Sequence, residues 1–84
     1  MYAVLIKLKK KSIRSKDLDS IDDAVEYAQD AVEDLDCPIA CIDFIRDGSS
    51  VLTCLDSGRI ESWSIAESDK DFDALNQFAE SYSC

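Results

Sequence analysis

Apolar residues recur every three or four positions between Ser20 and Asp36, which is the spacing of one face of an α-helix. At 100° per residue, the acidic residues of this segment fall on the opposite side. Ser20 is a suitable N-terminal cap, and Pro38 is expected to end the helix. The pattern therefore predicts an amphipathic helix with an acidic face, formed by Asp22, Asp23, Glu26, Asp30, Glu33 and Asp34.

Four other segments have the alternating or continuously apolar patterns of β-strands. Turn signals at Asp47-Gly48 and at Asp56 to Arg59 separate the last three of them, which predicts a three-stranded meander. The basic segment Lys9 to Lys16 is expected to be a connection without regular structure. The predicted strands are Met1 to Leu8, Ile39 to Arg46, Val51 to Leu55 and Ile60 to Ile65.

A last helix is expected from Ser68 or Asp69 to about Tyr82, with apolar residues along one side. Asp71 and Asp73 join Asp69 at its start, where the helix dipole favours negative charge. The element order β-α-β-β-β-α predicts one α+β two-layer domain over all 84 residues. In this domain, two helices pack on a small antiparallel or mixed sheet.

From Ile13 onward, the predicted order α-β-β-β-α resembles that of the double-stranded RNA-binding domain. Domains of that family present lysines at the start of the final helix. This chain has Asp69, Asp71 and Asp73 there. The resemblance therefore concerns topology alone and does not imply RNA binding.

The charge of the chain is strongly negative and unevenly distributed. It has 18 acidic and nine basic residues, a net charge of −9. Residues 1–16 hold six of the basic residues and none of the acidic ones, so the rest has three basic against 18 acidic residues, a net charge of −15. Such a chain is unsuited to bind nucleic acid or an anionic membrane directly. With no long apolar run and no signal-peptide pattern, we expect a soluble cytoplasmic protein.

The residue types do not match a catalytic, cofactor or metal site. The chain has no histidine, and its two glycines are too few for a phosphate-binding loop, so we expect neither an enzyme nor a cofactor. The aspartates of residues 17–23 lack the glycine and closing glutamate of a calcium loop. Cys37, Cys41, Cys54 and Cys84 lack paired zinc-knuckle spacing and are interpreted as free structural thiols, with a disulfide or a zinc site as alternatives.

The acidic helix face is the strongest functional feature of the sequence. Like-charge pairs such as Asp22/Glu26 cost about 0.2–0.5 kcal/mol each, and the helix contains no Lys or Arg to offset them. Carboxylates at about 6 Å intervals form a row of negative charge similar to a nucleic-acid backbone. A solvated face that only keeps the protein soluble is the alternative. The predicted partner-binding residues are Asp22, Asp23, Glu26, Asp30, Glu33, Asp34 and, as an aromatic anchor or else a core residue, Trp63.

These features favour a small, acidic, non-catalytic inhibitor that mimics nucleic acid and binds a basic, nucleic-acid-handling protein. In general character the sequence is similar to the anti-CRISPR and anti-restriction proteins of phages and mobile elements. Two alternatives remain open. One is an immunity or antitoxin protein that blocks a cognate toxin. The other is a plain interaction module, in which exposed strand edges would favour a homodimer.

Overall fold

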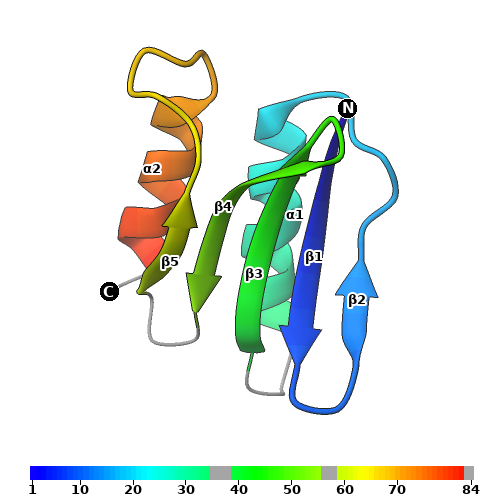
Figure 1. The fold of residues 1–84 in the computed structure, drawn as a ribbon. Helices are drawn as coiled ribbons and strands as arrows, with labels where there is room; N and C mark the ends of the chain where they lie inside the picture. The colour runs from blue at the N-terminus through cyan, green and yellow to red at the C-terminus, as the bar shows by residue number, and fades with distance from the viewer. Residues whose placement is uncertain (35–38, 56–58, 83–84) are drawn as a thin grey trace.

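The computed structural model describes residues 1–34, 39–55 and 59–82 of the chain. Two helices and a five-stranded sheet form two layers, so the predicted α+β two-layer fold is confirmed (Figure 1). No helix in the described part of the chain is long and apolar enough to span a membrane. The elements are β1 Tyr2–Leu8, β2 Ser12–Arg14, α1 Ile21–Asp34, β3 Ile39–Arg46, β4 Ser49–Leu55, β5 Ile60–Trp63 and α2 Phe72–Tyr82.

The sheet has the strand order β2-β1-β3-β4-β5, and every neighbouring pair is antiparallel. The predicted turn at Asp47-Gly48 joins β3 to β4. Both residues have positive φ, 52° and 85°, as a two-residue type I′ hairpin requires. The predicted helix end at 35–38, including Pro38, and the predicted turn at 56–58 lie outside the described residues.

The expectation that Lys9 to Lys16 lacks regular structure was wrong, because the short strand β2 lies inside it. Ile13 pairs with Ile6 of β1, and the Val4 N–H donates to Ser15 Oγ at 2.9 Å. Three residues are too few for periodicity to reveal a strand. The lysines around β2 help to prevent further pairing at this edge of the sheet.

Both helices pack on the same face of the sheet and bury the core against it (Figure 1). The small residues Ala24 and Ala28 of α1 are 1% and 0% exposed, so this helix lies close to the strands. The ring of Phe78 on α2 meets Phe44 of β3 edge to face, with 5.0 Å between the ring centroids. The apolar helix faces predicted from the sequence are therefore the ones that face the sheet.

The start of α1 agrees with the sequence prediction, whereas the start of α2 does not. At α1 the prediction is confirmed, since the Asp23 N–H donates to Ser20 Oγ at 3.2 Å. Helix α2 begins at Phe72, later than Ser68 or Asp69. Asp69 instead precedes the helix. Its side chain accepts a hydrogen bond from the Asp71 N–H at 2.9 Å and another from Arg46 of the sheet.

Candidate functional site

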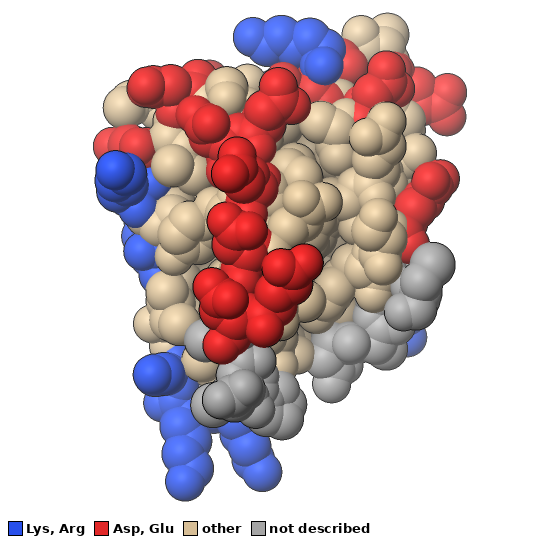
Figure 2. Space-filling view, turned by 180° about the vertical axis from the view of Figure 1, so that it is seen from behind, with Lys and Arg blue, Asp and Glu red and all other residues tan. Residues whose placement is uncertain are grey.

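The six carboxylates predicted on one face of α1 are all exposed and lie together on the surface. They form a continuous acidic band along the helix (Figure 2). Ala24 and Ala28 on the opposite side are buried, which fixes this rotation of the helix relative to the sheet. We call these six residues the acidic row: Asp22, Asp23, Glu26, Asp30, Glu33 and Asp34.

The acidic row has no partner of opposite charge within the described part of the chain. Ion pairs in that part of the chain join Met1 to Asp47, and Arg46 to Asp69 and Asp71, and none of these involves the row. Lys and Arg side chains lie at the margins of the view in Figure 2 and not within the band. Because their fields add, unpaired carboxylates at about 6 Å intervals give this surface a strongly negative potential.

Trp63 lies apart from the acidic row. It ends β5, the edge strand on the α2 side of the sheet, and its ring meets Phe72 edge to face at 5.0 Å. Its side chain is half-buried against the core. The structure therefore brings the six acids together but does not bring Trp63 to them.

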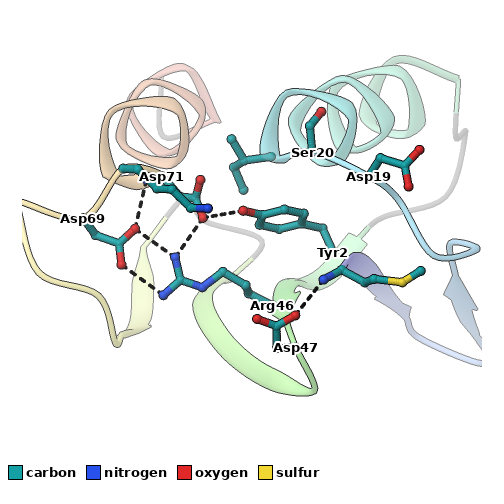
Figure 3. Close-up of a pocket in the computed structure, with 10 residues that line it drawn as sticks. Tyr2, Asp19, Ser20, Arg46, Asp47, Asp69 and Asp71 are labelled. Atoms are coloured by element: carbon teal, nitrogen blue, oxygen red, sulfur yellow. Dashed lines mark hydrogen bonds and ion pairs between the residues drawn. The ribbon is translucent and has the colours of Figure 1, made fainter.

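A second cluster of charged residues, which the sequence did not reveal, surrounds Arg46 at the end of β3 (Figure 3). Its guanidinium donates to both carboxylate oxygens of Asp69, at 2.8 and 3.0 Å, and to Asp71 at 2.8 Å. The hydroxyl of Tyr2 on β1 donates to the same Asp71 oxygen at 2.7 Å. These contacts fasten the segment before α2 to two strands of the sheet.

The pKa values in this Arg46 cluster follow from its hydrogen bonds and burial. The hydrogen bond from Arg46 lowers the pKa of Asp69 to about 2, and these carboxylates raise the pKa of the guanidinium. Burial, together with Asp71, raises the pKa of Tyr2 to about 12. Asp71 is only 3% exposed, and hydrogen bonds from Arg46 and Tyr2 satisfy its buried carboxylate.

The Arg46 cluster lines an open depression of about 770 Å³, but its charges are engaged with one another. On that ground we interpret it as a structural clamp. Sequence reasoning assigned Asp69 and Asp71 to the helix dipole alone. No local signal could have corrected this, because Arg46 is 23 and 25 residues away from them.

The described cysteines occupy different environments in the sheet. Cys41 on β3 is half-buried and Cys54 on β4 is fully buried, and both are free thiols. Burial raises both pKa values, that of Cys54 to about 11. Cys37 and Cys84 lie outside the described residues. Among the residues that are described, no group of three or more acidic or cysteine side chains could hold a metal ion.

The geometry thus offers an exposed acidic surface on α1 and a self-contained clamp at the end of β3. No protein-family model, curated protein or solved structure matches this chain.

Proposed function

We propose that this protein is a non-catalytic inhibitor that uses the acidic row to occupy a basic, nucleic-acid-binding surface of another protein. The supporting observation is that six exposed carboxylates share one helix face without a described cation among them. A helix evolved only for solubility commonly alternates charges, because like-charge neighbours destabilise it. Retaining the repulsion is consistent with a partner that supplies the opposite charge.

The inhibition would be steric and electrostatic. Carboxylates of the acidic row would pair with the Lys and Arg side chains that otherwise bind phosphates. Long-range attraction would accelerate association, and this acceleration would weaken as salt screens it. By likeness of character to anti-CRISPR and anti-restriction proteins, we propose a nucleic-acid-handling enzyme of a defence system as the target.

The test compares the acidic row with acids elsewhere on the surface. In the row variant, four of the six acids become lysines, so that the net charge of the helix face changes sign. Binding and inhibition should then be lost, since the partner would meet like charge. The row variant replaces Asp22, Glu26, Asp30 and Glu33.

A matched control reverses four exposed acids outside α1 and changes the net charge by the same amount. Like the row variant, it includes one acid in the first turn of a helix, so the two sets share the same loss of dipole stabilisation. Binding of this control should remain within about threefold of wild type at 0.15 M salt. The control replaces Asp17, Glu61, Glu67 and Asp73.

Each protein is immobilised and exposed to nuclease-treated bacterial lysate at about 50 and about 300 mM salt. The proposal expects that wild type and the control retain a nucleic-acid-binding protein from the lysate and that the row variant does not. Added DNA or RNA should displace the retained protein. Equal retention by the row variant would refute the proposal. If one protein is retained whether or not nucleic acid is added, the result would favour an immunity protein that blocks a cognate toxin over a nucleic-acid mimic.

A further inference from the structure

Two adjoining hollows lie between α1 and α2 on the outer face of the helix layer, with volumes of about 400 and 370 Å³. They share Gln29 of α1 with Phe78 and Ser81 of α2, so they form one continuous depression. In Figure 2 the surface is hollowed beside the acidic band. We call this depression the interhelical groove.

Apolar side chains of both helices form part of the lining of the interhelical groove, beside polar ones. Val25 and Val32 of α1 are half-buried and still reach the groove, although they also pack against the core. On the other side, Phe78 stacks on Tyr82, with ring centroids 5.7 Å apart and planes inclined by 18°. Apolar side chains of a partner would find preformed contacts on the half-buried side chains of this lining.

The two rims of the groove differ in charge. Three members of the acidic row, Asp22, Glu26 and Glu33, line the α1 side. The α2 side presents Gln77 and Ser81, which are uncharged. A partner that fits must therefore place basic groups along one flank of an apolar stripe, and not on both flanks.

The shape of the groove favours a helix as the occupant. Its acidic rim runs from Asp22 to Glu33, about 16 Å or three helical turns at 1.5 Å per residue. Both walls are helices, whose backbone groups are already hydrogen-bonded, so an extended segment would gain no ladder of hydrogen bonds here. A helix satisfies its own backbone and needs only side-chain contacts.

We propose that the interhelical groove binds an amphipathic helix of the partner. Its apolar stripe lies on the half-buried Val25, Val32 and Tyr82, and its Lys and Arg flank lies on the acidic rim. This inference rests on the proposed function and adds the recognition element: the target presents a basic amphipathic helix, of the kind that otherwise contacts nucleic-acid phosphates. The complementarity of charge and apolar surface selects this occupant over a second copy of this acidic chain.

The first test uses a fluorescent model peptide of about 16 residues, with leucines at i, i+3, i+4 and i+7 spacing and lysines and arginines along one flank. A scrambled peptide of identical composition has the same charge without the stripe. Measured by anisotropy at 0.15 M salt, the amphipathic peptide should bind at least about tenfold more tightly. Equal binding of both peptides would contradict the proposal that the groove recognises an apolar stripe, and would show that charge attraction alone explains the binding.

Two pairs of neutralised acids separate the groove from the acidic row as a whole. Glu26→Gln with Glu33→Gln changes the groove rim. Asp30→Asn with Asp34→Asn removes the same charge from acids that line a different hollow, on the other side of α1. The first pair should weaken binding of the amphipathic peptide about tenfold and the second less than about threefold. Equal weakening by both pairs would refute binding in the groove without affecting the proposed function.

Gln29→Trp fills the junction of the two hollows and keeps every carboxylate. It should reduce peptide binding at least about tenfold, and unchanged affinity would contradict the proposal. Amide chemical shifts of wild type provide a second measurement that needs no variant. The peptide should shift the groove faces of α1 and α2, whereas shifts confined to the uncovered sheet face would overturn the site. If the peptide binds here but nucleic acid displaces no captured partner, the groove stands and the proposed function fails.

Discussion

Replacing Arg46 with Met should destabilise the protein more than any other single change to a charged residue on its surface. The guanidinium, whose side chain is 26% exposed, holds Asp69 and a buried Asp71 whose side chain is 5% exposed. Methionine has a similar length but donates no hydrogen bond. Asp71 would then keep only the hydroxyl of Tyr2, and two neighbouring carboxylates would lose the guanidinium that binds them both.

The size of the effect follows from burial. Breaking a fully buried ion pair costs about 3–5 kcal/mol, and one hydrogen bond to a charged group contributes about 1.5–3 kcal/mol. Since Arg46 is about a quarter exposed, water can partly replace it, and we expect a loss of about 2–3 kcal/mol. For a domain of this size, the loss corresponds to a fall in Tm of about 10–20 °C.

Urea denaturation at pH 7 measures the loss, with Arg14→Met as the control, because Arg14 is an exposed residue of the edge strand β2. The control should change stability by less than about 0.5 kcal/mol. The pKa of Asp69 lies near 2 in the folded protein, below its usual 3.8, so its ionised form stabilises the fold above about pH 4. The difference between wild type and Arg46→Met should therefore shrink as the pH falls from 4 towards 2. A loss under about 0.5 kcal/mol at pH 7 would refute the clamp.

Three further predictions concern the helix face, the clamp and the core. Glu26→Lys should raise the free energy of unfolding by about 1 kcal/mol at low salt, because two repulsive i,i+4 pairs become attractive, and added salt should diminish the gain seen in urea denaturation. Tyr2→Phe should lower the free energy of unfolding by about 1–2 kcal/mol, because Asp71 loses a hydrogen-bond donor. Wild type should lose stability between pH 10 and 12, because the phenol ionises there in the unfolded chain but not in the folded protein, where its pKa is about 12. In urea denaturation across this pH range, the variant should lack that loss. Cys54, fully buried with a pKa of about 11, should resist iodoacetamide at pH 8 until global unfolding, as peptide mass mapping would show, and labelling at the rate of a free thiol would contradict this burial.

The two helices, four of the five strands and the exposed acidic row followed from the sequence, because all of them depend on local periodicity. The spacing of Ala24, Ala28 and their apolar neighbours fixes which side of α1 faces the sheet, whatever that sheet contains. The same spacing leaves the acids outside. Asp47-Gly48 predicted its hairpin for a similar reason, since few residue pairs tolerate positive φ at both positions.

Only the tertiary structure decided the features that depend on residues far apart in the chain. Arg46 meets Asp69 and Asp71 across 23 and 25 positions, and Tyr2 meets Asp71 across 69, so no local pattern signals the clamp. Strand β2 forms because β1 offers it an edge, not because three residues favour it. The interhelical groove exists because both helices lie on one face of the sheet, and an arrangement on opposite faces would have satisfied the same amphipathic patterns.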